Sequence, residues 1–258
     1  MIFIYFWIAA QIIVEMLPVS SSTHLYVLQE FFKKRFTAIE LKDFYYFLHL
    51  PTLIIITAYF GRSWLQLVFD AGTLNVKPFI WVIIADGITG ISFLLMRKSK
   101  KEFPVCAGLC ITAAALWLTA WSCGTRSIGV WQYHDAIILG FAQSVALLPG
   151  ISRLAFTCSV GCLLGFSLVD SFFLSWLIYA PLMAVACAKS ILDLYKQHAL
   201  KQLLNLPIAL VIIISGVVSY LVLIMITMMI TTNTFFLWGW YLMLPLALCV
   251  WLAIKKRS

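Results

Sequence analysis

The segment EMLPVSSSTH, residues 15–24, interrupts a long apolar run near the start of the chain. It follows MIFIYFWIAA (1–10) and precedes LYVL (25–28), so an acid, a proline, three serines and a histidine stand inside an otherwise membrane-like segment. A second interruption, LLPGISR (147–153), again places a proline beside hydroxyl residues. Within a bilayer, irregular backbone persists only where protein or a wet cavity surrounds it. Both breaks are therefore predicted to lie inside the protein.

The composition of the whole chain makes a membrane the expected setting. Of the 258 residues, 63% are apolar and 11% are charged, whereas a soluble domain normally carries about a quarter charged residues. The mean hydropathy is +1.01. Too little polar surface remains to coat a water-soluble globule. The chain is therefore predicted to be an all-α, multi-pass integral membrane protein with a single domain over residues 1–258.

Six stretches are apolar over a length that can cross a bilayer, which takes about 20 residues. They are Phe44–Phe60, Phe79–Met96, Val105–Ser122, Phe172–Leu192, Leu206–Thr231 and Phe235–Ile254. The two interrupted regions, 2–32 and 135–168, are each predicted to form a re-entrant helical hairpin. In such a hairpin, two short helices enter and leave the bilayer on the same side.

The basic residues indicate the orientation of these segments. A net charge of +8 could suggest nucleic acid, but in a membrane protein Lys and Arg mark the cytoplasmic loops, and no nucleic-acid partner is expected. With a cytoplasmic C-terminus, three basic residues fall outside, Arg62, Lys77 and Arg126, and Arg153 falls within the second hairpin. The basic residues predicted inside are Lys33, Lys34, Arg35, Lys42, Arg97, Lys98, Lys100, Lys101, Lys189, Lys196, Lys201, Lys255, Lys256 and Arg257. Both termini are thus predicted to be cytoplasmic.

The order of segments predicts an inverted repeat. A hairpin followed by three spans occurs twice, in halves of about 1–122 and 123–258. Because three is odd, the second half is expected to be inverted relative to the first. One hairpin then enters from the cytoplasm and the other from outside, and their tips meet near the midplane, as in transporters built on inverted repeats.

Meeting tips would gather the polar residues of both breaks. Each alone has an ordinary structural explanation, such as a Glu15–Arg153 pair that only joins two helices, or a packing histidine at His24. An acid, a histidine, an arginine and several hydroxyls together favour a functional site, because ionisable residues in a membrane are costly. The candidates are Gln11, Glu15, Ser20, Ser21, Ser22, Thr23, His24, Gly150, Ser152, Arg153 and Thr157.

The chemistry of these residues indicates an anionic ligand. Arg153 offers a planar fork that suits phosphate, and Gly150 lets the backbone approach a ligand closely. Ser152 stands where a helix N-cap would stand, so the following helix would direct free N–H groups at the site. Glu15 could act as a general base or as an oxygen ligand for a divalent ion. In an apolar setting, the natural substrate is a phosphate or pyrophosphate head on a lipid tail.

Two segments resemble the bacterial undecaprenyl-diphosphatase family, whose members are also called bacitracin-resistance proteins. QIIVEMLPVSSSTH (11–24) is similar to its (E/Q)-x-x-x-E segment and the LPVSS…H run that follows. GFAQSVALLPGISRLAFT (140–157) is similar to its second signature, which ends in P-G-x-S-R-x-x-x-T. The resemblance implies hydrolysis of undecaprenyl pyrophosphate to undecaprenyl phosphate, which recycles the lipid carrier of cell-wall synthesis. It also implies Mg²⁺ or Ca²⁺ as cofactor and the bacterial inner membrane as location.

The resemblance further implies roles for single residues. Glu15 matches the second, catalytic acid of the motif and would bind the metal, and Gln11 matches the first position. Ser21 matches the serine often proposed as nucleophile, His24 the motif histidine, and Arg153 the pyrophosphate-binding arginine. The implied catalytic residues are Glu15, Ser21, His24 and Arg153. The implied substrate-binding residues are Gln11, Ser20, Ser22, Gly150, Ser152, Arg153 and Thr157.

Departures from the family pattern keep alternatives open. Gln11 stands where many members have Glu, and Gln cannot act as a base. Leu154, Ala155 and Phe156 replace the S-G-A that commonly follows the arginine. A transporter or flippase for the polyprenyl phosphate carrier and an inactive paralogue are the alternatives, although transport of a lipid needs no serine run. Ser21, Ser20 and water all stay open as nucleophile, and a homodimer is compatible with the sequence.

The remaining polar residues and cysteines have simpler interpretations. Asp86 lies within a predicted span, where pairing across a helix interface is favoured over a role in the site. Asp135 and Asp170 flank the second hairpin and are expected to be solvated. The seven cysteines lie mostly in apolar runs without a C-x-x-C pair, so they are expected to be packing residues rather than metal ligands or disulfide partners. They are Cys106, Cys110, Cys123, Cys158, Cys162, Cys187 and Cys249.

Overall fold

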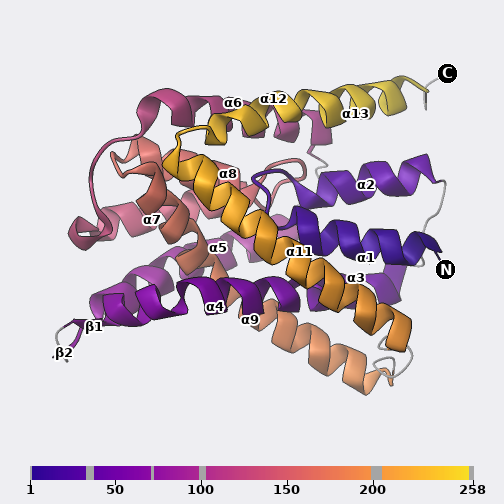
Figure 1. Ribbon diagram of the computed structural model, residues 1–258, viewed down its shortest axis with the longest axis horizontal. Coiled ribbons are helices and arrows are strands. Elements are labelled where there is room, and N and C mark those ends of the chain that lie inside the picture. Colours follow the sequence, from indigo (N-terminus) through magenta and orange to yellow (C-terminus); the bar gives the residue numbers. More distant parts are fainter. Residues whose placement is uncertain (1, 33–37, 71–72, 99–102, 199–204, 256–258) are drawn as a thin grey trace.

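A computed structural model describes residues 2–32, 38–70, 73–98, 103–198 and 205–255 as a helical bundle (Figure 1). Its first half contains α1 (Ile2–Val14), α2 (Ser21–Phe31), α3 (Ala38–Phe47), α4 (His49–Val68), β1 (Phe69–Asp70), β2 (Thr73–Leu74), α5 (Lys77–Lys98) and α6 (Val105–Ser122). Its second half contains η1 (Ile128–Val130), α7 (Tyr133–Val145), α8 (Arg153–Leu163), α9 (Leu168–Lys196), α11 (Leu206–Thr231), η2 (Phe235–Leu237), α12 (Trp238–Tyr241) and α13 (Met243–Lys255).

Six helical segments of the described residues are long and apolar enough to cross a membrane, which confirms the predicted number. They are Asp43–Val68, Lys77–Arg97, Val105–Ser122, Leu168–Lys196, Leu206–Thr231 and Phe235–Leu252. The last segment is not one regular helix, because a 3-10 turn and the short α12 precede α13. A two-residue antiparallel ladder between α4 and α5, which pairs Phe69 with Leu74, is a further feature that the apolar pattern did not predict.

The two interrupted regions form pairs of short helices. α1 and α2 contact each other, as do α7 and α8. Pro18 and Pro149 lie in the connections, where a proline lacks an N–H and disfavours helix at the residue before it. Each pair is followed by three long segments, in the predicted order. That each pair enters and leaves the bilayer on one side, and that the halves are inverted, both stay predictions.

The described chain ends lie at the same end of the molecule. The start of α1 and the end of α13 are on the right of Figure 1, and β1–β2 is at the opposite end. This agrees with termini on one side of the membrane but does not identify the side. Several basic residues used in the orientation prediction lie outside the described residues: Lys33, Lys34, Arg35, Lys100, Lys101, Lys201, Lys256 and Arg257.

α9 is the central helix of the bundle. Half of its most apolar 18-residue window is buried, compared with 17% for α5. It contacts α3, α4, α5, α8 and α11. α5 and α11 instead expose many large apolar side chains, including Ile83, Leu95 and Ile213, as expected for helices that face lipid. A polar side chain on α9 can therefore reach the interior of the protein.

Two sequence expectations are wrong. Cys123 and Cys162 form a disulfide, although the cysteines were expected only to pack, and the other five are free. Asp135 is fully buried rather than solvated, because Arg126 neutralises it through two hydrogen bonds of 2.9 and 2.6 Å. Asp86 accepts a hydrogen bond from Gln143 Nε2 at 3.1 Å across the α5–α7 interface, as favoured for that position.

Candidate functional site

Glu15 is the centre of the polar cluster between the two helix breaks. Its carboxylate oxygen Oε1 accepts hydrogen bonds from Arg153 Nη2 at 3.1 Å and from the Tyr179 hydroxyl at 2.9 Å. Its oxygen Oε2 accepts from Ser21 Oγ at 2.8 Å and from Gln11 Nε2 at 3.3 Å. The residue is only 9% exposed. A buried charge is costly unless it is paired and hydrogen-bonded, and these four donors meet both requirements.

Two helices begin at this carboxylate. Ser21 is the first residue of α2 and Arg153 is the first residue of α8. Helix N-termini carry unpaired N–H groups and a positive partial charge, so they favour anions. The side chain of Ser152 caps α8 by accepting from the Ala155 N–H, whereas Ser20 makes no side-chain cap at α2. The cluster is therefore a place where a phosphate group is electrostatically favoured.

The connection before α8 is held against α6. Gly150 has a φ of +88°, a conformation that glycine adopts without strain. The Thr112 hydroxyl accepts from the Ser152 N–H at 2.9 Å and lies 3.0 Å from the Gly150 carbonyl oxygen. Gly108 on α6 allows this approach, because a Cβ there would lie 2.1 Å from the Pro149 carbonyl oxygen. Gly150 and Ser152 thus fix the backbone at the start of α8. This backbone determines the position of Arg153, the first residue of the helix.

The cluster contains two residues that the sequence did not single out as candidates. The Arg153 guanidinium lies over the ring of Tyr179, which comes from the middle of α9. His49, the first residue of α4, places Nδ1 3.6 Å from Glu15 Oε1. A histidine beside an apolar span is an ionisable residue in the membrane, and that signal could have identified His49. Tyr179 carried no comparable signal, because tyrosines also occur in ordinary membrane helices.

Some predicted site residues lie beside the cluster rather than in it. His24 sits one turn further along α2, where Nδ1 lies 2.7 Å from the Ser20 carbonyl oxygen and Nε2 lies 3.1 Å from the Tyr241 hydroxyl. Ser20 Oγ accepts a hydrogen bond from Thr23 Oγ1 at 3.0 Å and is hydrogen-bonded to Ser22 Oγ at 3.1 Å. His24 therefore contacts α12, whereas Ser20, Ser22 and Thr23 are hydrogen-bonded to one another.

Thr157 lies one turn further along α8 than Arg153 and makes its hydrogen bonds away from the Glu15 carboxylate. Its hydroxyl bonds to the carbonyl oxygen of Arg153 and to Ser175 Oγ, each at 2.8 Å, at the α8–α9 interface. The predicted residues that the structure brings together around one carboxylate are therefore Gln11, Glu15, Ser21 and Arg153.

The oxygen atoms of the cluster that could bind a divalent cation are too few to hold it alone, so they suit a cation that also binds the substrate. In the described part of the chain, no group of three or more His, Cys, Asp or Glu side chains could hold a metal ion. Gln11 Oε1, however, is a buried oxygen without a hydrogen-bond partner among the described residues, next to the Glu15 carboxylate. Mg²⁺ is commonly held by one or two carboxylates together with substrate phosphates. One carboxylate and one amide oxygen suit that mode.

Fold and site together define a multi-pass helical membrane protein with a buried acid–arginine centre at two helix breaks. The family model described as Bacitracin resistance protein BacA matches residues 9–248, and the chain belongs to this family.

Individual relatives agree with this assignment. Undecaprenyl-diphosphatase of Elusimicrobium minutum is 29% identical over 192 residues, which cover 70% of this chain and 72% of the relative. Undecaprenyl-diphosphatase of Thermodesulfovibrio yellowstonii is 31% identical over a region that covers 71% of this chain and 70% of the relative. Undecaprenyl-diphosphatase 2 of Halalkalibacterium halodurans is 28% identical over a region that covers 81% of this chain and 80% of the relative. The family match covers most of the chain and includes both helix breaks, at residues 15–24 and 147–153.

Proposed function

We propose that this chain is an undecaprenyl-diphosphate phosphatase of the bacterial inner membrane. It removes the terminal phosphate of undecaprenyl pyrophosphate and releases undecaprenyl phosphate and inorganic phosphate, so that the lipid carrier returns to cell-wall synthesis. The family and the names of its relatives support this function. The structural observation that carries it is the contact of Glu15 with the first residues of two helices, Ser21 and Arg153.

The pyrophosphate group is bound by positive charge. Arg153 uses one guanidinium nitrogen for Glu15, and its side chain is 24% exposed, so further N–H donors can reach phosphate oxygens. The N-terminal N–H groups of α2 and α8 add donors on the same side. The exposed apolar surface of the bundle leaves the prenyl tail in lipid. The polar head and the apolar tail of the substrate thus suit a buried polar cluster in a protein whose outer surface is apolar.

The nucleophile is the Ser21 hydroxyl, with Glu15 as general base. Ser21 Oγ already donates to Glu15 Oε2 at 2.8 Å, which is within the range for proton transfer. Ser21 attacks the terminal phosphorus and gives its proton to Glu15, while the bond from that phosphorus to the bridging oxygen breaks. Undecaprenyl phosphate leaves with the electron pair. Water then attacks the phosphorus of the phosphoserine, and the bond between that phosphorus and Ser21 Oγ breaks. Glu15 returns its proton to Ser21 Oγ, and inorganic phosphate departs with both hydrogens of the water.

Ser20 is less suited to attack, because its hydroxyl bonds to Ser22 and Thr23 rather than to a carboxylate. Water instead of serine is the remaining alternative, and Ser21→Ala distinguishes the two. A serine nucleophile predicts activity near background for Ser21→Ala and substantial activity for Ser20→Ala. Residual Ser21→Ala activity within about tenfold of wild type would favour water, since general-base catalysis by Glu15 would survive.

Mg²⁺ or Ca²⁺ is proposed as the cofactor, held by Glu15 and Gln11 together with the substrate. When bound, a divalent ion offsets the negative charge of the pyrophosphate. Gln11 contributes its carbonyl oxygen and, through Nε2, keeps Glu15 Oε2 in position. Gln at this place leaves one carboxylate in the cluster, so Glu15 alone accepts the proton from Ser21.

The decisive experiment measures phosphate release from undecaprenyl pyrophosphate by the purified protein in detergent with Mg²⁺ or Ca²⁺. Wild type is expected to release phosphate, and Glu15→Ala and Arg153→Ala are expected to be near background. Thr157→Ser serves as a matched control, because it keeps the hydroxyl at the α8–α9 interface. A wild-type protein that binds the lipid but releases no phosphate with either ion would support transport or an inactive paralogue instead.

Both termini are proposed to be cytoplasmic. The excess of basic residues near the predicted cytoplasmic loops supports this orientation. The first and last described helices share one end of the molecule (Figure 1), which supports placing both termini on the same side.

A further inference from the structure

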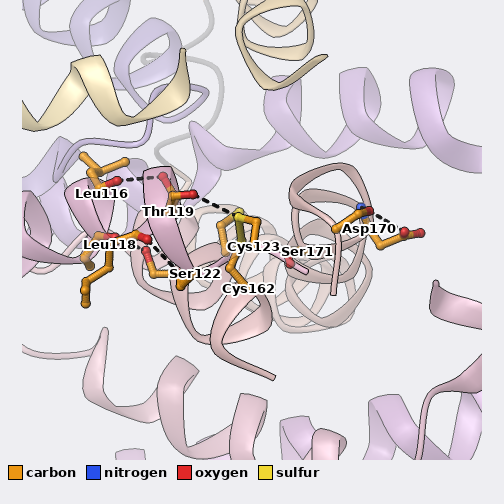
Figure 2. The surroundings of a disulfide bond; sticks show 12 residues. Leu116, Leu118, Thr119, Ser122, Cys123, Cys162, Asp170 and Ser171 are labelled. Carbon is orange, nitrogen blue, oxygen red and sulfur yellow. Dashed lines mark hydrogen bonds between the residues drawn. A yellow bond between two sulfur atoms is a disulfide. The ribbon is translucent and has the colours of Figure 1, made fainter. Parts of the chain in front are cut away.

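The end of the molecule opposite the termini carries a covalent link that the proposed chemistry does not use. Cys123 directly follows α6, and Cys162 lies in the last turn of α8. Their disulfide joins the two helices. Figure 2 shows the two cysteines between the end of α6, with Thr119 and Ser122, and the start of α9, with Asp170 and Ser171.

Backbone contacts accompany this disulfide. The segment after α6 runs beside the segment after α8: the Gly124 N–H donates to the Phe166 carbonyl oxygen at 3.1 Å, and the Arg126 N–H donates to Gly165 at 2.9 Å. The Arg126 carbonyl oxygen accepts from the Ser167 N–H at 3.1 Å. Cys162 is fully buried. The two thiols are therefore brought together by an ordered local structure rather than by a chance approach of mobile loops.

The location of the disulfide indicates a compartment. Disulfides persist in oxidising spaces such as the bacterial periplasm and are rare in the cytosol. Cys123 lies three residues before Arg126, at the end of the molecule where the basic-residue pattern predicts the outside. The distribution of basic residues depends on charge, whereas the disulfide depends on redox chemistry, so the two observations are independent. Both assign this end of the bundle to the extracytoplasmic side.

We propose that Cys123 and Cys162 form an extracytoplasmic disulfide that holds α8, and with it Arg153, in position against α6. The two thiols lose two protons and two electrons, which reduce the disulfide of an extracytoplasmic thiol oxidase to a dithiol. Because Cys162 is buried in the folded protein, oxidation precedes complete packing of α8. Once formed, the bond is shielded from reductants.

The position of α8 depends on contacts with α6 along its whole length. Thr112 holds the start of α8 through the Ser152 N–H. Ser159 Oγ, in the middle, donates to the carbonyl oxygen of Ala115. The disulfide fastens the far end. α8 has 11 residues, a length of about 16 Å at 1.5 Å per residue. A helix fastened at both ends cannot tilt or slide freely, so the Arg153–Glu15 geometry at its start is preserved.

The bond itself is tested by mass spectrometry of protein extracted from membranes in the presence of N-ethylmaleimide and digested without reductant. The expected product is a Cys123–Cys162 cross-linked peptide, with Cys110, an exposed free cysteine, alkylated as internal control. In cells without an extracytoplasmic thiol oxidase, both cysteines should carry the maleimide when the protein is extracted under denaturing conditions. Alkylation of both in wild-type cells, or an undiminished cross-link without the oxidase, would overturn the proposal.

The positioning role is tested with the double variant Cys123→Ala/Cys162→Ala and the control Cys110→Ala. Since a small misplacement of a binding group can lower a rate by up to about 100-fold, phosphate release by the double variant is expected to fall about tenfold, with a raised KM. Equal kinetics of double variant and control would refute the positioning role. This arm rests on the proposed function, whereas the peptide mapping does not. If the double variant fails to fold, the single variant Cys123→Ser, which removes the bond at the less buried of the two cysteines, replaces it.

Discussion

At the scale of single residues, the Glu15 carboxylate is the group on which the other site residues converge. Glu15 is bonded to Gln11, Ser21, Arg153 and Tyr179 at distances from 2.8 to 3.3 Å. These partners come from α1, α2, α8 and α9, so residues distant in sequence converge on a single acid. The motif resemblance predicted Gln11 and Glu15 as site residues, and the two helix breaks predicted Arg153 as a partner of Glu15. Tyr179 became visible only with the packing of α9.

Removal of the Tyr179 hydroxyl should impair the reaction without disrupting the fold. Tyr179→Phe keeps the ring beneath the Arg153 guanidinium but deletes a hydrogen bond to a charged carboxylate, which is worth about 1.5–3 kcal/mol. We expect kcat/KM for phosphate release to fall about tenfold or more. Tyr59→Phe is the control, because its hydroxyl bonds to Thr227 away from the cluster. Equal kinetics for the two variants would show that Tyr179 does not position Glu15.

The unusual amide at position 11 gives a prediction about the cation. Gln11→Glu places a second carboxylate beside Glu15, and two neighbouring carboxylates repel each other unless a cation lies between them. The Mg²⁺ concentration for half-maximal phosphate release should therefore fall several-fold relative to wild type. Gln66→Glu, at an exposed position on α4, adds the same charge as a control. An unchanged Mg²⁺ dependence in Gln11→Glu would argue against cation binding by this pair.

At the scale of helices, the two breaks could be predicted from sequence because proline and hydroxyl residues interrupt apolar runs. The contacts that position each break could not. Support for α8 comes from Thr112 and Gly108, which look like ordinary residues of an apolar span. The Cys123–Cys162 pairing was also hidden, since a spacing of 39 residues says nothing about distance in space. The split of the last span into η2, α12 and α13 has no signal in hydropathy alone.

Close packing of α6 against the start of α8 is tested at Gly108. Gly108→Ala adds a Cβ that would lie 2.1 Å from the Pro149 carbonyl oxygen, so the backbone before Arg153 must move. We expect a lower thermal stability in detergent and at least a tenfold loss of phosphate release, because overpacking costs about 1–3 kcal/mol and Arg153 is displaced. Gly87→Ala on α5 has open space around the new Cβ and should match wild type. Wild-type stability and activity in Gly108→Ala would contradict this packing.

At the scale of the whole molecule, the apolar pattern predicted an all-helical protein and the number of segments that are long enough to cross a membrane. Six membrane-spanning segments are present among the described residues, and the described chain ends share one end of the molecule (Figure 1). Orientation in the membrane depends on the two compartments as well as on the fold, because charge and redox state differ between the two sides. The opposite end carries Lys77 beside β1–β2, and the shared end carries Lys196 at the end of α9.

Labelling at these two lysines tests the orientation. Lys77→Cys and Lys196→Cys, each combined with Cys110→Ser, place one exposed thiol at either end. A membrane-impermeant maleimide added to intact bacterial cells with a permeable outer membrane should label only Lys77→Cys. Lys196→Cys should react only after the inner membrane is opened. The reverse pattern would show that the termini are extracytoplasmic.

The central claim is that Glu15 and Arg153, from two separate helix breaks, act as one catalytic unit. The most direct measurement is the initial rate of phosphate release from undecaprenyl pyrophosphate by wild type, Glu15→Gln, Arg153→Gln and the double variant. Residues that act as a unit are strongly non-additive. We predict that each single variant loses at least about 100-fold and that the double variant is no slower than the slower single one. Multiplied losses in the double variant, or near wild-type rates in either single variant, would contradict the account.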